Sequence, residues 1–256
     1  MSLKPRILIT NDDGIDAPGL QKLAESLSRD WDIFIAAPEK QKSAVSNALN
    51  ISNPLRVYES RRNGYCRSWA INGTPADCVK LALTTLLGFK PDLLISGINH
   101  GQNTAINILY SGTVAGAAEG LLFGVPSIAA SLASHDYSAN MGNAVEYVKT
   151  IAHAVLAKGL PYGTMLNVNI PDIPAGEIRG IKVTHQSKNT WNDRYEERKD
   201  PFGRTYYWFA GSFGNGDPNP DCDDNAVAAG YVSVTPIEFN FTSTGNIKKV
   251  KSIFTN

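Results

Sequence analysis

The sequence predicts an α/β fold built on a mostly parallel sheet. Three observations lead to this prediction. Short apolar runs have the character of strands, they alternate with segments that carry apolar residues at helical spacing, and a strand such as residues 33–37 is apolar on both faces. Two-sided apolarity is typical of parallel strands covered by helices on both sides. A chain of 256 residues with 43% apolar content is also long enough to bury a large core.

The first elements alternate strand, helix and strand. A buried strand is expected at residues 7–10, and a helix is expected to begin near Pro18, because proline is favoured in the first helical turn. The next strand, at residues 33–37, is expected to end at Pro38. This order is that of a βαβ unit, in which the two strands are parallel.

A helix start is expected at Thr74. Thr74 as N-cap, Pro75 in the first turn and Asp77 three positions after the cap form the pattern of a capping box. This helix is expected to reach Leu87 and to stop at Gly88. The alternation then continues with strands at residues 93–96, 127–130 and 165–170 and helices at residues 114–122 and 141–157.

The composition changes after Pro171. The aromatic run at residues 204–210 follows a turn signal and predicts one arm of a β-hairpin, and the polar run at 214–224 predicts an exposed loop. A strand at 231–234 and a basic C-terminal helix complete the chain. We therefore expect residues 1–171 to form the core that carries the site, and residues 172–256 to continue the same domain.

Charge and composition exclude several classes of protein. Lys+Arg and Asp+Glu both number 24, so the formal net charge is zero, and a nucleic-acid polymer is not an expected partner. No apolar stretch approaches the roughly 20 residues that span a bilayer. The three cysteines show no Cys-x-x-Cys spacing, which argues against a zinc site or a disulfide framework. We expect a cytoplasmic protein with no membrane partner.

Two adjacent carboxylates, Asp12 and Asp13, directly follow the first strand. Two like charges in a partly buried turn are costly unless a cation or several donors neutralise them. The pair therefore predicts a divalent metal, although an Asp-Asp-Gly sequence can also be a simple turn with Asp as a helix cap.

Other polar residues follow the neighbouring strands, and the carboxyl ends of parallel strands meet at one edge of the sheet. Ser43 follows the second strand, and Asn99 and Asn103 follow the strand expected to end near Ser96. Two carboxylates with the oxygens of Ser43 and Asn99 form a hard ligand set that suits magnesium or manganese. Ser43 alone could be a solvated loop serine, and Asn99 a turn residue.

An anion site is expected at the start of the helix that follows. Ser111, Gly112 and Thr113 offer hydroxyls and free backbone N–H groups, and the helix dipole favours a phosphate there. The alternative is that these hydroxyls only cap the helix. A metal beside a phosphate site predicts phosphoryl-ester hydrolysis, with His100 as a possible proton donor.

Other phosphate-handling classes lack their motifs. A response-regulator receiver needs an acceptor aspartate after a later strand, where this chain has Ser96. Neither the dinucleotide-binding glycine pattern nor the P-loop pattern is present, and the adjacent acids differ from the Asp-x-Asp of aspartyl nucleophiles.

Several motifs in order closely resemble the SurE family (survival protein SurE). They are the segments at residues 7–15, 37–39 with Ser43, 73–79, 96–101, 110–114, 191–193 and 230–236. The resemblance implies a Rossmann-like core with a protruding β-hairpin and a C-terminal arm exchanged between subunits, in a homodimer or homotetramer. It also implies a metal-dependent 5′-nucleotidase that acts on nucleoside 5′-monophosphates and sometimes on short polyphosphate.

The resemblance also assigns roles to residues. Asp12, Asp13, Ser43 and Asn99 take the metal-ligand positions of the family, and Asp12, Asp13 and Asn99 are expected to serve catalysis. The segment near the bound phosphate comprises Asn103, Ser111, Gly112 and Thr113. A competing hypothesis is a non-catalytic protein that binds a nucleotide or a metal and regulates a partner.

Overall fold

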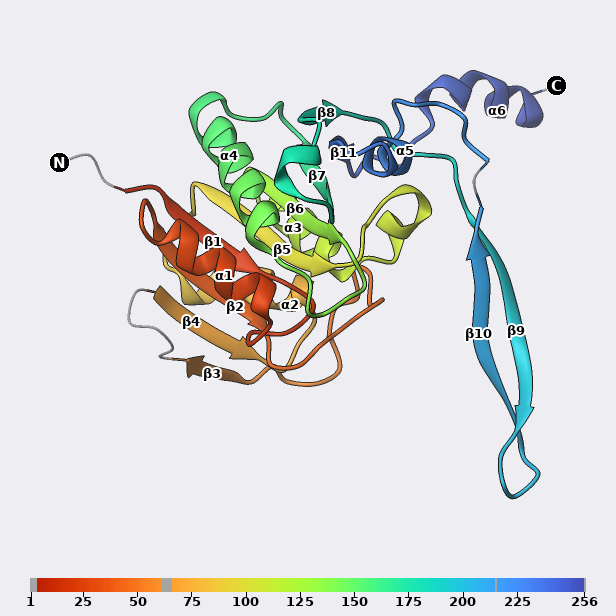
Figure 1. Cartoon of the computed structure of the whole chain (residues 1–256), viewed down its shortest axis with the longest axis horizontal. Coiled ribbons are helices and arrows are strands. Elements are labelled where there is room, and N and C mark those ends of the chain that lie inside the picture. The colour runs from red at the N-terminus through yellow and green to blue at the C-terminus, as the bar shows by residue number, and fades with distance from the viewer. Residues whose placement is uncertain (1–3, 61–65, 215, 256) are drawn as a thin grey trace.

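The core of the computed structural model is one nine-stranded sheet within the described residues, which are 4–60, 66–214 and 216–255 (Figure 1). The strand order is β3-β4-β2-β1-β5-β6-β7-β11-β8. The strands are β1 (Arg6–Thr10), β2 (Asp32–Pro38), β3 (Val57–Ser60), β4 (Cys66–Ile71), β5 (Leu93–His100), β6 (Ser127–Ala133), β7 (Thr164–Pro171), β8 (Ile181–Val183) and β11 (Val232–Glu238).

The six strands from β4 to β7 in this order run parallel to one another. The outer strand β3 is antiparallel to β4, and β11 is antiparallel to β7. The predicted α/β class with a mostly parallel sheet is therefore confirmed. Two consequences follow for the site: all six parallel strands end at one edge, and β11 brings the last part of the chain into the same sheet.

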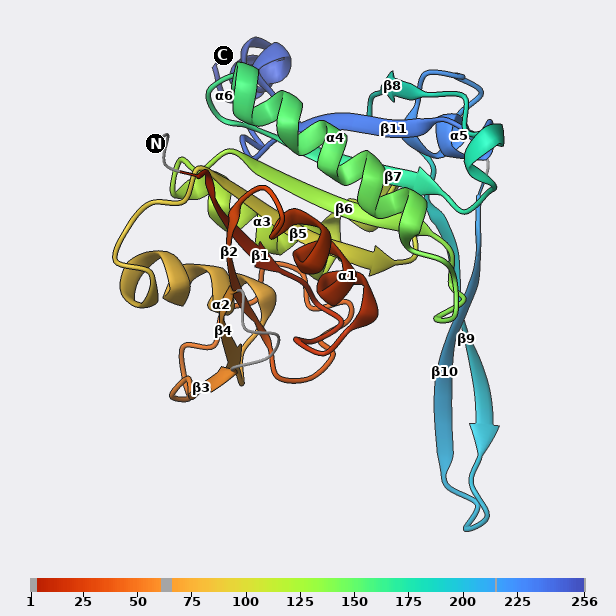
Figure 2. The same ribbon diagram turned by 60° about the vertical axis from the view of Figure 1, so that its left-hand side comes forward.

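Helices cover both faces of the sheet (Figure 2). On one face α1 and α4 pack with side chains such as Ile7 and Ile9, and on the other face α2 and α3 pack with Leu8 and Leu94. Alternate residues of β1 thus enter opposite apolar cores, as the two-sided strand pattern requires. The α-helices are α1 (Pro18–Leu27), α2 (Pro75–Leu81), α3 (Gly112–Leu122), α4 (Gly142–Lys158), α5 (Asp223–Ala228) and α6 (Ile247–Phe254).

The start of α2 confirms the predicted capping box. The Thr74 hydroxyl accepts a bond from the Asp77 N–H at 3.1 Å, and the Asp77 carboxylate accepts one from the Thr74 N–H at 3.0 Å. The helix end differs from the prediction, because the α-helix stops at Leu81 and a π-helical turn continues at Ala82–Leu86. Short 3-10 helices lie at Ala105–Leu109, Ala175–Glu177 and Thr244–Asn246.

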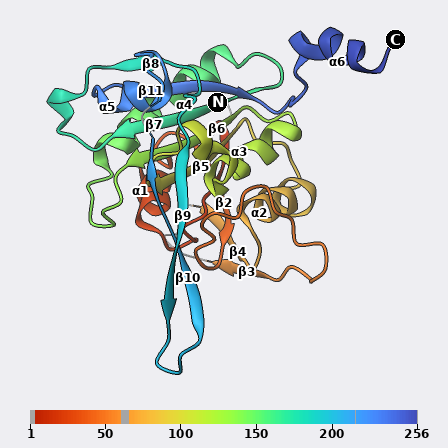
Figure 3. The same cartoon turned by 90° about the vertical axis from the view of Figure 1, so that its right-hand side faces the viewer.

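The hairpin predicted after Pro171 is formed by β9 (Trp191–Lys199) and β10 (Thr205–Phe213). It projects far from the core, on the side that faces the viewer in Figure 3. Several of its large side chains are exposed, namely Trp191, Tyr195, Phe202, Tyr206, Tyr207, Trp208 and Phe209. The predicted C-terminal helix is α6, which buries none of its residues.

The prediction of an exposed loop at 214–224 is wrong at its end; residue 215 lies outside the described residues. Asp223 and Asp224 form the first turn of α5, and their exposed fractions are 0% and 7%. Acidic residues are favoured in a first helical turn by the helix dipole. The polar composition of the run predicts a solvated loop. The Asp223 carboxylate is instead buried, and backbone N–H groups donate to it.

None of the helices in the described parts of the chain is long and apolar enough to cross a membrane.

Candidate active site

Backbone hydrogen bonds join the turn after β1 to the loop after β2 at the carboxyl edge of the sheet. The Lys42 N–H donates to the Asp12 carbonyl at 2.7 Å, and the Ile15 N–H donates to the Pro38 carbonyl at 2.8 Å. The amide Nε2 of Gln41 lies 2.9 Å from Ser43 Oγ and 3.5 Å from Asp13 Oδ1. The amide group of Gln41 therefore lies between the predicted ligand Ser43 and the carboxylate of Asp13.

Asn99 lies in a strand rather than in the loop that was expected after Ser96. The strand β5 continues to His100, with a register shift between Ser96 and Asn99 in its pairing with β6. Gly97 allows this irregularity, because its φ is 140° and a Cβ there would lie 2.3 Å from the Ala130 carbonyl oxygen. The Nδ2 of Asn99 donates to the Gly101 carbonyl at 2.7 Å, which leaves the Oδ1 oxygen as the acceptor end of the side chain.

The carboxylates of Asp12 and Asp13 are buried or partly buried, which disfavours their ionised forms. Burial raises the pKa of Asp12 to about 6, and the neighbouring charge of Asp13 adds to this, while the Thr113 hydroxyl, 2.6 Å from Asp12 Oδ1, acts in the opposite direction. Burial also raises the pKa of Asp13, whose Oδ2 is buried without a hydrogen-bond partner in the structure. A buried carboxylate oxygen with no donor is expected to have a cation as its partner.

The first residues of α3 lie against the side chain of Asp12. Ser111 is the N-cap and accepts from the Val114 N–H at 3.1 Å, so the capping role left open by the sequence is present. The Thr113 hydroxyl donates to Asp12 rather than to open space. A Cβ at Gly112 would lie 2.8 Å from the Asp12 Cβ, so only glycine allows the helix start to approach this closely. The structure thus brings the predicted phosphate segment and the acidic pair together.

Asn103 belongs to a buried polar network. Its N–H donates to Asn169 Oδ1 at 2.7 Å, its Nδ2 donates to Ser131 Oγ at 2.9 Å, and its carbonyl accepts from Asn167 Nδ2 at 2.7 Å. Asn167, Asn169 and Ser131 were not predicted from the sequence as residues of the site. The available signal was a pair of asparagines at alternate positions of an otherwise apolar strand, which is an unusual burial of amides.

The ring of His100 lies 4.9 Å from that of Tyr137. Burial lowers the pKa of His100, and both ring nitrogens are buried without a hydrogen-bond partner in the structure. The imidazole is therefore mainly neutral at neutral pH. A neutral imidazole does not favour the hypothesis that His100 donates a proton to the leaving group.

The donor set fits a hard divalent cation. Asp13 Oδ2 has no donor, the hydrogen bond of Asn99 Nδ2 to Gly101 leaves Asn99 Oδ1 as an acceptor, and burial raises the pKa of Asp12. Within the part of the chain that the structure describes, no three His, Cys, Asp or Glu side chains gather as a metal cluster. Two carboxylates with neutral oxygens suit magnesium or manganese better than zinc.

Comparison with known proteins identifies the family. The profile described as "Survival protein SurE" matches residues 7–193. The chain belongs to the SurE family. A relative named 5′-nucleotidase SurE, from Christiangramia forsetii, is 42% identical over 97% of this chain and 96% of its own length. Another of the same name, from Heliobacterium modesticaldum, is 46% identical over 96% of this chain and 90% of its own length.

A solved SurE structure has the same fold. The crystal structure of the SurE protein from Aquifex aeolicus superposes with a TM-score of 0.86 at 37% identity, and covers 98% of this chain and 100% of its own. The resemblance to the SurE family and the α/β fold that it implied are therefore confirmed.

Proposed function

We propose that this SurE-family chain is a divalent-metal-dependent 5′-nucleotidase that hydrolyses nucleoside 5′-monophosphates to nucleoside and phosphate. The observation that carries the proposal is the close approach of the α3 start to Asp12, beside the unpartnered Asp13 Oδ2. This close approach supports a cation site and an anion site next to each other. The names of the relatives, 5′-nucleotidase SurE, support the same activity.

Asp12, Asp13, Ser43 and Asn99 would hold the metal, either magnesium or manganese. When bound, such a cation polarises a phosphoryl oxygen and lowers the pKa of a coordinated water. Two of the proposed ligands are already oriented by hydrogen bonds within the protein. The Thr113 hydroxyl donates to the Asp12 carboxylate, and the Asn99 amide donates to the Gly101 carbonyl. Ligands that are fixed before the metal arrives reduce the reorganisation that the reaction requires.

The start of α3 and Asn103 would bind the phosphate of the substrate. Ser111 and Gly112 lie at the N-terminal, positive end of α3. Asn103, which follows β5, is held by hydrogen bonds to Asn169 and Ser131. The Thr113 side chain is committed to Asp12, so we assign it to the alignment of the metal ligand. Short polyphosphate offers the same terminal phosphate, and we propose it as an additional substrate of this site.

We propose that residues 172–256 supply an oligomerisation arm in addition to completing the sheet, and that the protein is a homodimer or homotetramer. The exposed aromatic side chains of the hairpin and the α6 helix that buries none of its residues support an assembly. Light scattering of the purified protein measures the molar mass of the assembly, and the mass of a monomer would contradict the proposed homodimer or homotetramer. The cytoplasmic location expected from the sequence stays a prediction.

The decisive experiment measures phosphate release from nucleoside monophosphates and from p-nitrophenyl phosphate. We expect turnover with added manganese or magnesium and none after chelation. Nucleotide binding without turnover under any metal would contradict the enzyme and favour the alternative of a regulatory protein.

A further inference from the structure

The loop from Asn103 to Ser111 has a predicted substrate-binding residue at each end. Between these ends runs the 3-10 helix Ala105–Leu109. Ala105, its first residue, is fully buried and has a φ of 52°, a left-handed conformation that residues other than glycine seldom adopt. A conformation of this kind persists only when contacts from the surroundings impose it.

Two residues from the C-terminal half of the chain hold Ala105 on both sides. The Ala105 N–H donates to Asp223 Oδ2 at 3.0 Å, and the Ala105 carbonyl accepts from Gln186 Nε2 at 2.8 Å. Asp223 begins α5, and Gln186 follows β8, so both contacts bridge long separations in sequence. A third contact, from Trp191 Nε1 to Asn107 Oδ1 at 2.7 Å, joins the base of the hairpin to the same helix.

Asp223 is oriented for this contact by the rest of its surroundings. Its Oδ1 accepts from the Ser187 N–H at 3.0 Å and from the Asp224 N–H at 2.9 Å, which leaves Oδ2 for Ala105. The side chain is fully buried, and no ion pair to it is present among the described residues. Its burial raises its pKa, and backbone donors oppose that shift. A buried carboxylate without a cation is unusual unless such donors hold it.

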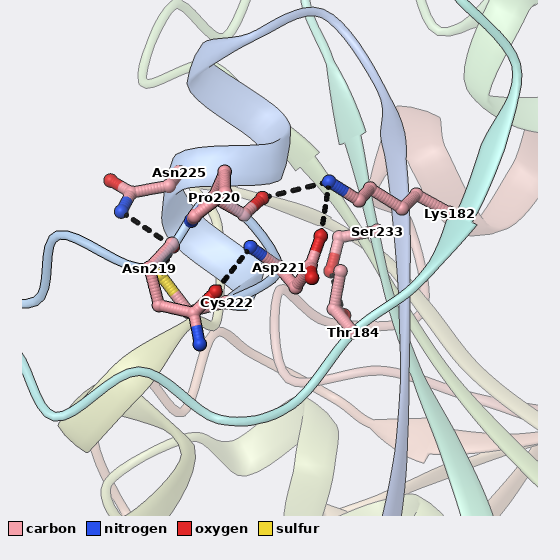
Figure 4. Close-up of polar contacts among 8 residues, drawn as sticks. All are labelled: Lys182, Thr184, Asn219, Pro220, Asp221, Cys222, Asn225 and Ser233. Atoms are coloured by element: carbon pink, nitrogen blue, oxygen red, sulfur yellow. Dashed lines mark hydrogen bonds and ion pairs between the residues drawn. The ribbon is translucent and has the colours of Figure 1, made fainter.

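The turn that presents Asp223 is itself fixed (Figure 4). Lys182 Nζ lies 2.8 Å from the Pro220 carbonyl and 2.7 Å from Asp221 Oδ1. The Asn219 carbonyl accepts from Asn225 Nδ2 at 2.9 Å and from Cys222 Sγ at 3.0 Å. These contacts hold the turn that precedes Asp223. The position of Asp223 relative to Ala105 therefore depends on β8, α5 and this turn.

We propose that Asp223 and Gln186 are positioning residues that hold the loop 103–111 in the conformation in which Asn103 and Ser111 meet the phosphate of the substrate. This inference rests on the proposed function. It assigns to the C-terminal part of the chain a role in substrate binding, through the backbone of Ala105 and without contact to the substrate.

Asp223→Asn isolates the contact with Ala105. An amide that keeps its oxygen toward the two N–H groups of Ser187 and Asp224 must direct its NH₂ group at the Ala105 N–H, which is a donor. Gln186→Ala removes the second contact from an exposed position and leaves the packing of the core unchanged. Asp200→Asn is the matched control, because it makes the same chemical change at the turn of the hairpin, where the carboxylate accepts from the N–H groups of Phe202 and Arg204 and pairs with the Arg204 side chain.

The experiment compares steady-state kinetics of the three variants with a nucleoside monophosphate and manganese. We expect the KM of Asp223→Asn to rise about 10-fold or more, which is the effect of losing a hydrogen bond to a charged group, and that of Gln186→Ala to rise about 3-fold or more. The manganese concentration for half-maximal activity is expected to stay unchanged, because Asp12, Asp13 and Asn99 lie outside the loop. The control is expected to keep the wild-type KM.

Hydrogen exchange of the amides in residues 103–111 gives a second readout that does not need turnover. We expect faster exchange in Asp223→Asn and Gln186→Ala than in the wild type or in Asp200→Asn. Wild-type KM and wild-type exchange in Gln186→Ala and in folded Asp223→Asn would overturn the inference; if Asp223→Asn does not fold, Gln186→Ala decides. A wild-type protein with no turnover would instead contradict the proposed function, and the exchange data would still test the positioning.

Discussion

Replacing Asp12 with Asn is expected to stabilise the metal-free protein while it removes activity. Burial raises the pKa of Asp12 from 3.8 to about 6, so the ionised side chain opposes folding at neutral pH. Between pH 4 and 6 the folded chain keeps a proton that the unfolded chain has lost, and stability therefore falls as the pH rises through this window. Above it the full cost of about 3 kcal/mol is present. The neutral amide of Asp12→Asn avoids that cost.

Urea unfolding in the presence of a chelator measures the difference. At pH 8 we expect Asp12→Asn to be more stable than the wild type by up to about 3 kcal/mol, and the difference to shrink toward pH 4. Added manganese is expected to stabilise the wild type and to have little effect on the variant, because binding to the folded state alone raises stability. Asp200→Asn, at the hairpin turn where hydrogen bonds lower the pKa of Asp200, is the control and should gain no stability.

A metal-free Asp12→Asn protein that is less stable than the wild type at pH 8 would refute this reasoning. It would mean that protein donors, rather than a missing cation, neutralise Asp12. Near-normal turnover in the variant would show that the metal lies elsewhere.

Three further substitutions test the surroundings of Asp12 and the fold. Gly112→Ala places a Cβ 2.8 Å from the Asp12 Cβ, so we expect at least a 10-fold loss of kcat/KM in phosphate-release assays, and normal kinetics would contradict the close approach. Thr113→Val removes the hydroxyl that lowers the pKa of Asp12, so the acid limb of the pH–activity profile is expected to move to higher pH; an unmoved limb would contradict that role. Thr74→Ala breaks the capping box and should cost about 1 kcal/mol in urea unfolding with unchanged turnover, whereas full stability would argue against the cap.

Local patterns predicted the parallel core well. The strand and helix signals of the first half depend on neighbouring residues, and the structure has them within a few positions, including the capping box of α2. The strands β3 and β4 were missed: β3 is the edge strand and is short and exposed, and β4 lies next to it. Their identity depends on pairing with β2 rather than on their own composition.

The candidate site was predicted as separate residues, and the contacts that hold it were not. Asp12 and Thr113 are recognisable from their positions after a strand and at a helix start, whereas Asn99, expected in a loop, lies near the end of β5. The long-range contacts are not recognisable in that way: the Ala105 backbone depends on Asp223, 118 residues away, and Asp223 lies in a run whose polar composition predicts an exposed loop. A buried carboxylate that binds only backbone N–H groups leaves no local signal in the sequence.

The most direct test of the central claim is a crystal structure with manganese and a nucleoside 5′-monophosphate, with the metal located from its anomalous scattering. The account predicts one manganese peak bounded by Asp12, Asp13, Ser43 and Asn99, and the phosphate between that peak and the start of α3. A peak away from Asp12 and Asp13, or a phosphate bound elsewhere with this site empty, would contradict it.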